Sequence, residues 1–309
     1  SGPAAAAGPG PLRSPDQLRR EVWVDGPGGR IHGLVSVPAN RTGPRPAVVL
    51  VHGGPFQQAR DVYDPLSQIL VSVGLTVVRV NYRGSSGYGA TWRNDFSGGV
   101  GHTQLADLAA VRAALVDDGT VDPDRVLLWG SSWGGYLTLL ALGAQPDLWR
   151  LGVAVNPVAD YVAAFHATTP AIQALDVTLF GGTPEQLPER YAVASPITYL
   201  DQVTAPVLLS VSTDDVRCPP EPVRRYARLL RDRGVPVELV TQQSGHLDLR
   251  AHSQLALIEQ VLLFIQTHLG GARDERPHVT LRLRERPDAD RPAVPVRTHS
   301  SRDLLSAEC

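Results

Sequence analysis

Short apolar runs rich in valine, isoleucine and leucine recur along the chain and alternate with stretches of helical periodicity. The helical pattern is clearest at 104–116 and 249–269, where apolar residues repeat on one face. Continuous apolar runs of strand length are typical of parallel strands that are buried on both faces. Their alternation with helices predicts an α/β fold with a mostly parallel, doubly wound sheet and helices on both faces. The expected strands are 47–51, 76–80, 126–129, 153–155, 206–211 and 237–241.

One of these runs leads into a glycine-rich turn that holds a serine. Residues 130–135 read Gly-Ser-Ser-Trp-Gly-Gly, follow the run at 126–129 and precede a helix-like segment. This is the G-x-S-x-G pattern in strand–turn–helix order, where small neighbours let the chain turn sharply and the serine Oγ project. We therefore predict that Ser132 is a nucleophile in an α/β-hydrolase fold. The alternative is a glycine turn whose serine only caps the helix.

A serine hydroxyl needs a base that is itself oriented by a carboxylate, and in this fold the three residues occur in the order Ser, Asp, His. Asp215 follows the run at 206–211, and His246 follows the run at 237–241. Because the carboxyl ends of parallel strands meet at one edge of the sheet, we expect both side chains to lie near Ser132. Asp214 competes with Asp215 for the role of the acid.

Acyl transfer also requires hydrogen-bond donors for the oxyanion. His52-Gly53-Gly54-Pro55 follows the run at 47–51 and resembles the H-G-G element that supplies one donor. The backbone N–H of Trp133, next to the predicted nucleophile, would supply the other. A plain turn at the end of a strand is the alternative for residues 52–55.

Composition excludes several other classes of function. The net charge of -2 provides no field for polyanions, so we expect no nucleic-acid partner. A chain without lysine cannot carry a phosphate-binding P-loop, and we find no Cys/His cluster of metal-ligand spacing, so we expect no metal and no cofactor. The two cysteines, Cys218 and Cys309, do not suggest a disulfide framework. The apolar runs are too short to span a membrane, and a cytoplasmic location is expected.

Six segments in fixed order resemble the catalytic domain of the prolyl oligopeptidase (S9) family, nearest its acylaminoacyl-peptidase and dipeptidyl-peptidase branch. The resemblance covers about residues 20–270. It implies a serine peptidase that acts on a short peptide or an acylated substrate, with Asp215 rather than Asp214 as the acid. It also implies an oxyanion hole formed by Gly54 and Trp133, and an Arg217 that binds a substrate carbonyl. The segments are 52–55, 81–89, 130–135, 195–197, 215–219 and 245–246.

The chain departs from the family pattern in three ways. Val211-Ser212 stands where many members have His-Gly, and Trp133 stands where Tyr is commoner. Only about 20 residues precede the hydrolase domain here, too few for the β-propeller that limits substrate size in this family. Either a propeller was removed with an upstream segment or the hydrolase stands alone, so peptide specificity does not follow from the resemblance. An esterase, a thioesterase, or an acyltransferase or peptide cyclase with the same triad is therefore the alternative function, and a non-catalytic binding module is the alternative of a different class. A homo-oligomer is possible by analogy with family members.

The domain organisation follows from where the periodic patterns begin and end. Residues 1–18 are rich in Ala, Gly and Pro, and residues 272–309 are rich in Arg, Pro and Asp. We expect a flexible leader at 1–18, an α/β-hydrolase catalytic domain at 19–271 and a mostly disordered tail at 272–309. A hairpin is expected near the start of the domain, and 157–203 is expected to be helical or irregular and to lie over the sheet edge, where it could line the site.

Overall fold

The computed structural model of the protein describes residues 17–39, 43–247 and 250–269. The predicted tail and residues 1–16 of the predicted leader lie outside these ranges and remain predictions. Gln17 and Leu18, which the leader was predicted to include, already belong to a strand and pair with Pro38 and Val37.

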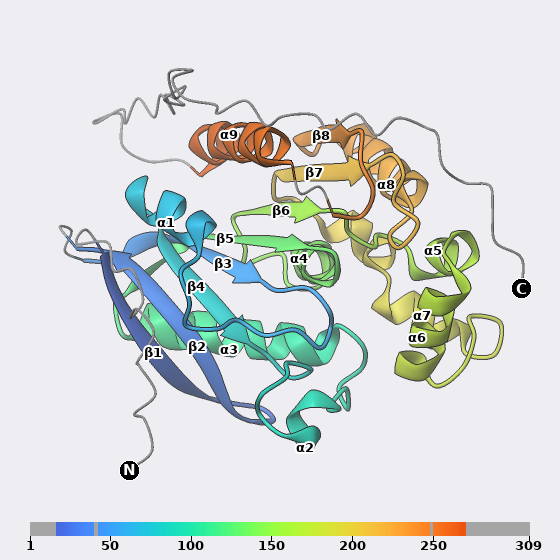
Figure 1. Ribbon diagram of the computed structural model, residues 1–309, viewed down its shortest axis with the longest axis horizontal. Coiled ribbons are helices and arrows are strands. Elements are labelled where there is room, and N and C mark those ends of the chain that lie inside the picture. Colours follow the sequence, from blue (N-terminus) through green and yellow to red (C-terminus); the bar gives the residue numbers. More distant parts are fainter. Residues whose placement is uncertain (1–16, 40–42, 248–249, 270–309) are drawn as a thin grey trace, which may run out of the picture. The chain divides into compact units, whose positions relative to one another are not determined.

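The described strands form one sheet of eight (Figure 1). They are β1 Gln17–Gly26, β2 Gly29–Pro38, β3 Arg45–Val51, β4 Thr76–Asn81, β5 Val121–Ser131, β6 Leu151–Val155, β7 Val207–Ser212 and β8 Val237–Gln242. Their order is β1-β2-β4-β3-β5-β6-β7-β8. From β4 to β8 all neighbours are parallel, whereas β2 is antiparallel to both β1 and β4. The mostly parallel α/β-hydrolase sheet and all six expected parallel strands are thereby confirmed.

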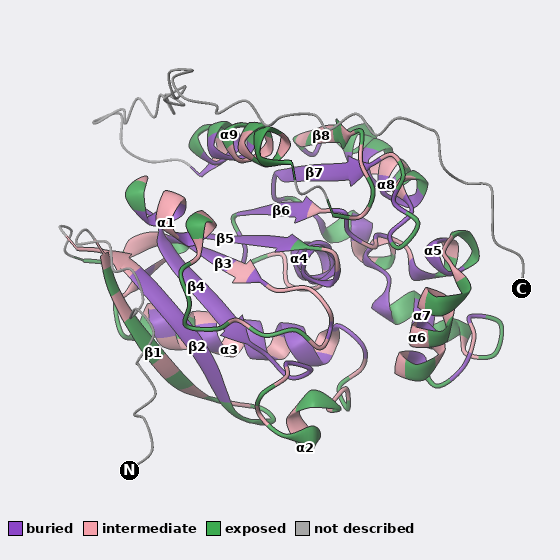
Figure 2. Cartoon of the chain, viewed as in Figure 1, coloured by how far each residue is buried: buried purple, intermediate pink, exposed green. Residues whose placement is uncertain are grey.

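The central strands are apolar on both faces because both faces are covered. In β5, Val126 and Leu128 pack into one hydrophobic core, and Leu127 and Trp129 pack into the other. Figure 2 shows the middle of the sheet as buried and the edge strand β1 as only partly so. Side chains of a strand point alternately to the two faces, which is why the sequence shows continuous apolar runs instead of alternation.

Helices supply the cover on each side. α3 (His102–Asp117), α4 (Trp133–Ala144) and α8 (Pro220–Asp232) contribute to the first core. α1 (Pro65–Ser72) and α9 (Ala251–His268) contribute to the second. No helix in the described ranges is both long enough and apolar enough to cross a membrane.

The stretch at 157–203 is helical, as expected, and projects beyond the carboxyl ends of the parallel strands (Figure 1). Its aromatic side chains form a chain of ring contacts that starts on α4 at Tyr136 and continues through Tyr161, Phe180 and Tyr191. This cluster fixes the added helices over the end of the sheet where the predicted site lies. The elements are α5 Tyr161–Ala167, α6 Pro170–Phe180, α7 Pro188–Ala194 and the 3-10 helix η1 Pro196–Gln202, with the short α2 at Ala90–Arg93 elsewhere.

Candidate active site

Ser132 lies on the sharp turn between β5 and α4. Its backbone has φ 58° and ψ -120°, a conformation that L-residues adopt only when their surroundings enforce it. A Cβ at Gly130 would lie 2.1 Å from the carbonyl oxygen of Gly134, and one at Gly134 would lie 2.0 Å from that of Val51. The small residues of the motif are therefore a steric requirement of the turn, as the sequence predicted.

The side chain of Ser132 is linked to His246 and, through it, to Asp215. His246 Nε2 lies 2.9 Å from Ser132 Oγ, and His246 Nδ1 lies 2.7 Å from Asp215 Oδ2. With the Nδ1 proton donated to the carboxylate, the Nε2 lone pair faces the serine hydroxyl. The structure thus joins the three predicted residues in one hydrogen-bonded chain, although they are far apart in the sequence.

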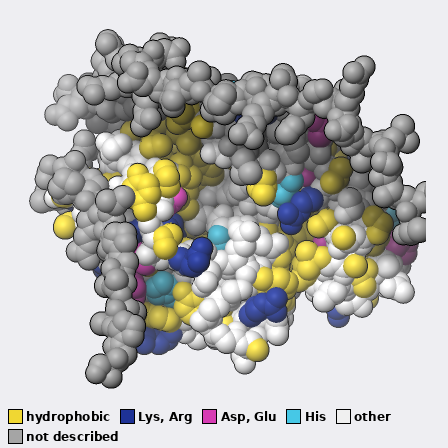
Figure 3. All heavy atoms as spheres, viewed as in Figure 1, with side chains coloured by type: hydrophobic (Ala, Val, Ile, Leu, Met, Phe, Trp, Pro, Cys, Tyr) yellow, Lys and Arg dark blue, Asp and Glu magenta, His cyan; other side chains and the backbone are white. Residues whose placement is uncertain are grey.

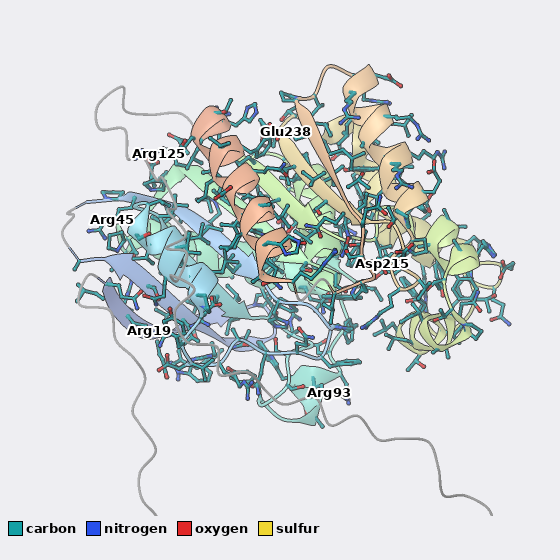
Figure 4. All side chains as sticks on the ribbon, turned by 45° about the horizontal axis from the view of Figure 1, so that its top comes forward. Arg19, Arg45, Arg93, Arg125, Asp215 and Glu238 are labelled. Carbon is teal, nitrogen blue, oxygen red and sulfur yellow. The ribbon has the colours of Figure 1, made fainter. Side chains whose placement is uncertain are left out.

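The carboxylate at the end of this series of hydrogen bonds belongs to Asp215, which lies in the loop after β7 (Figure 4). Its side chain is buried, and Oδ1 accepts the backbone N–H groups of Arg217 and Cys218, each at 2.9 Å. These bonds hold the carboxylate so that Oδ2 faces His246. Asp214 is exposed, whereas the buried Asp215 is the aspartate that contacts His246, which supports Asp215 as the acid.

Asn156 is a site residue that the sequence reasoning missed. It follows β6 with φ 46°, and its Nδ2 donates to the carbonyl of His246 at 2.9 Å and to Ser212 Oγ at 3.1 Å. Asn156 therefore holds the loop that carries His246 against the strand ends. The available signal was an asparagine directly after a buried strand, since asparagine tolerates the left-handed conformation.

Of the two predicted oxyanion donors, Gly54 lies in the loop after β3 and Trp133 directly follows Ser132. Among the described residues, neither the N–H of Gly54 nor that of Trp133 has a hydrogen-bond acceptor. Gly54 has φ 128°, and a Cβ there would lie 2.4 Å from the nitrogen of Phe56, so this position requires glycine. Trp133 is the first residue of α4, where N–H groups lack partners within the helix.

His52, the first residue of the Gly54 loop, is fixed rather than poised for proton transfer. It stacks on Tyr82 at 4.2 Å between ring centroids, and its Nε2 lies 2.8 Å from Ser85 Oγ. Burial, partly offset by a hydrogen bond to the Gly53 carbonyl, lowers the pKa of His52 to about 4, so the ring is neutral at pH 7.

The segment at 81–89 braces the Gly54 loop and is itself anchored by a buried ion pair. Arg83 Nη2 lies 2.8 Å from Asp107 Oδ1 on α3, and the backbone N–H of Arg83 donates to Asp107 Oδ2 at 2.8 Å. Ser86 N donates to the carbonyl of Gln57 at 3.1 Å. The ion pair thus fixes the segment at 81–89, which in turn positions residues 52–57 through the bond between Ser86 and Gln57.

A pocket that is open to solvent adjoins Ser132. On the face seen in Figure 3, hydrophobic, histidine and arginine side chains gather between the strand ends and the added helices. Arg217 is exposed and belongs to the lining, whereas Asp176 of α6 belongs to it but is buried. The lining residues are Gly54, Ser132, Trp133, Val158, Tyr161, Ala164, Thr168, Ile172, Leu175, Asp176, Leu179, Arg217 and Cys218.

Cys218 brings a thiol close to Asp215 and His246. The potential ligand atoms of Asp215, Cys218 and His246 lie within 4.8 Å of one another, the one group of this kind in the described ranges. Both ring nitrogens of His246 already contact Asp215 and Ser132. Burial raises the pKa of the Cys218 thiol, which keeps it protonated and non-nucleophilic. A metal here would have to displace the contacts that link the serine, histidine and aspartate.

Comparison with known proteins identifies the family. The chain matches the prolyl oligopeptidase family over residues 63–272. It is 31% identical to the acylamino-acid-releasing enzyme of Rattus norvegicus over 231 residues, which cover 73% of this chain and 32% of the relative. The chain thus spans about a third of the length of that curated relative.

Solved structures agree with this assignment. A puromycin-hydrolyzing peptidase of Mycobacterium tuberculosis superposes with a TM-score of 0.78 at 30% identity, covering 84% of this chain and 41% of that one. An acylaminoacyl peptidase of Pyrococcus horikoshii has a TM-score of 0.76 at 24% identity, covering 86% and 43%, and supports the fold. The sheet, the turn that carries Ser132 and these similarities together establish that the chain belongs to the prolyl oligopeptidase family of serine peptidases.

Proposed function

We propose that this chain hydrolyses amide bonds of short or acylated peptides through an acyl-enzyme on Ser132. The observation that carries the proposal is the continuous hydrogen-bonded chain from Ser132 through His246 to the buried Asp215, at 2.9 and 2.7 Å. The names of the similar proteins, an acylamino-acid-releasing enzyme and a puromycin-hydrolyzing peptidase, favour amide substrates over esters.

The proposed mechanism assigns one task to each residue. His246 Nε2 takes the proton of Ser132 Oγ as that oxygen attacks the acyl carbon, and Asp215 orients and stabilises the imidazolium. The N–H groups of Gly54 and Trp133 stabilise the oxyanion. His246 then donates its proton to the departing amine, and water, activated by the same histidine, releases the acyl group from Ser132. Arg217, exposed at the pocket, is proposed to bind a carbonyl of the substrate.

A comparison of leaving groups tests the proposed substrate class. We expect the protein to cleave acetyl-amino acid p-nitroanilides as well as the matching p-nitrophenyl esters, because the oxyanion donors and the general acid serve both reactions. The measurement is kcat/KM for each pair. Ester turnover without amide cleavage would show an esterase or thioesterase instead. An aminolysis product that replaces hydrolysis when an amine is added would show an acyltransferase.

Replacing Gly54 by alanine tests the oxyanion assignment. We expect kcat to fall about 10²- to 10³-fold, the usual effect of losing one oxyanion donor, because a Cβ at this φ of 128° meets the nitrogen of Phe56 and displaces the N–H. Gly119→Ala is the matched control, since Gly119 has φ 73° with no neighbouring atom within 4 Å of the added Cβ. If folded Gly54→Ala keeps the kcat of the control, the donor lies elsewhere.

A further inference from the structure

Asp176 is a buried carboxylate without a partner, placed in the wall of the pocket that holds Ser132. Only 6% of the residue is exposed. In the described part of the chain, no hydrogen bond or ion pair reaches its carboxylate, and Arg217, the cation of the same pocket, forms no ion pair with it. The proposed mechanism does not use this group.

Three phenols lie near the carboxylate, those of Tyr136, Tyr161 and Tyr191, and in the described part of the chain none of them forms a hydrogen bond with it. Tyr136 OH donates to the carbonyl of Val100, and Tyr191 OH donates to that of Gly182. The carboxylate is close enough to all three phenols to add to the rise in pKa that their burial causes. Burial of an unpaired carboxyl is unfavourable, and buried acids are normally paired. Burial also raises the pKa of Asp176 to about 7.

The rest of the pocket wall indicates what kind of substrate group would pair with the Asp176 carboxylate. Val158, Ala164, Ile172, Leu175 and Leu179 form an apolar lining around the acid. A side chain with a long apolar stem and a cationic end satisfies both features, since its methylene groups contact the wall and its charge meets the carboxylate. The pocket also contains Gly54, Ser132 and Trp133, so its occupant would be the side chain next to the scissile carbonyl.

We propose that Asp176 determines specificity in this pocket and selects arginine or lysine at the residue whose carbonyl is attacked by Ser132. This inference rests on the proposed function, because it assigns a substrate class to the same site. Asp176 acts in binding and takes no part in proton transfer.

The test compares N-acetyl-arginine p-nitroanilide with its citrulline counterpart, which has the same length and no charge. We expect kcat/KM at pH 8 to favour arginine by about 10²-fold or more, and this ratio to approach one in Asp176→Asn. Glu185→Gln is the matched control, since it removes an exposed carboxylate after α6 and leaves the ratio unchanged. A ratio near one in the unmodified protein, or an unchanged ratio in Asp176→Asn, would overturn the assignment.

The pH dependence of this ratio gives a second readout. Both substrates use the same nucleophile and base, so effects on the steps that they share cancel in the ratio. Tyr136, Tyr161, Tyr191 and Cys218 stay uncharged from pH 5 to 9 because burial raises the pKa of each. The ratio should therefore follow Asp176, rising up to tenfold per pH unit below about pH 7 and levelling above it. A flat ratio in the unmodified protein contradicts the proposal.

Thermal unfolding separates a folding defect from a loss of specificity. A carboxyl whose pKa is higher in the folded state than in the unfolded state binds more protons when folded, so stability falls as the pH rises from about 4 to about 7. Asp176→Asn lacks this fall and should have a higher Tm than the unmodified protein at pH 8. An equal or lower Tm would show that the carboxylate is already paired. If neither protein cleaves either anilide, the proposed function fails. If both proteins cleave the anilides with equal arginine preference, only the role of Asp176 fails.

Discussion

Replacing Ser132 by alanine is expected to lower kcat by about 10⁶-fold, as in other triads where the nucleophile is removed. The reason is geometric: Ser132 Oγ is the atom at 2.9 Å from His246 Nε2, and alanine leaves the histidine with no hydroxyl to activate. The oxyanion donors and the pocket remain, so a residual acceleration of roughly 10³- to 10⁴-fold over water is expected. The measurement is kcat on an acetyl-amino acid anilide.

The adjacent serine provides the matched control for this experiment. Ser131 belongs to the same motif and is exposed, and Ser131→Ala should keep kcat within a few-fold of the unmodified protein. A fluorophosphonate probe should label Ser132 in the unmodified protein and in Ser131→Ala, and should fail to label Ser132→Ala. Full activity in Ser132→Ala would remove Ser132 from the mechanism and with it the proposed function.

The parallel strands and the candidate triad were predictable because each depends on a local pattern. A strand segment buried on both faces is mostly apolar, as 126–129 of β5 and 207–211 of β7 are, and the turn around Ser132 leaves room only for glycine at 130 and 134. Asp215 and His246 follow strand ends, which the topology brings to one edge. The choice between Asp214 and Asp215 needed either a family resemblance or the direction of each side chain, since both follow the same strand.

The features that were missed depend on contacts between distant segments. Asp176 lies on a helix with no strong apolar face in its sequence, so nothing local shows that this carboxylate is buried beside Ser132. The first residues of β1 read as part of an Ala/Gly/Pro-rich leader, and only their pairing with β2 makes them a strand. Cys218 reads as an isolated cysteine until the loop after β7 folds it back toward His246.

Replacing Asp107 by asparagine is expected to lower the free energy of unfolding by about 3–5 kcal/mol, the usual effect of removing one partner from a buried ion pair. Asp107 is fully buried, and its carboxylate accepts both the guanidinium and the backbone N–H of Arg83. Asparagine has nearly the same volume as aspartate but no charge, and its NH₂ group would face the N–H donors of Arg83. Urea unfolding of the full chain, compared at constant m-value, measures the change.

Asp118→Asn is the matched control for this prediction. Asp118 pairs with Arg20 at 2.8 Å, but both side chains are exposed, so its replacement should change stability by no more than about 1 kcal/mol. A similarly small loss in Asp107→Asn would contradict the inference that the Arg83 pair anchors residues 81–89.

If the pair does anchor them, Asp107→Asn assayed well below its unfolding transition should also lose kcat, because the segment at 81–89 positions the Gly54 loop through Ser86 and Gln57. Asp118→Asn, whose partners are Arg20 and Thr120 rather than residues of 81–89, should keep its kcat unchanged.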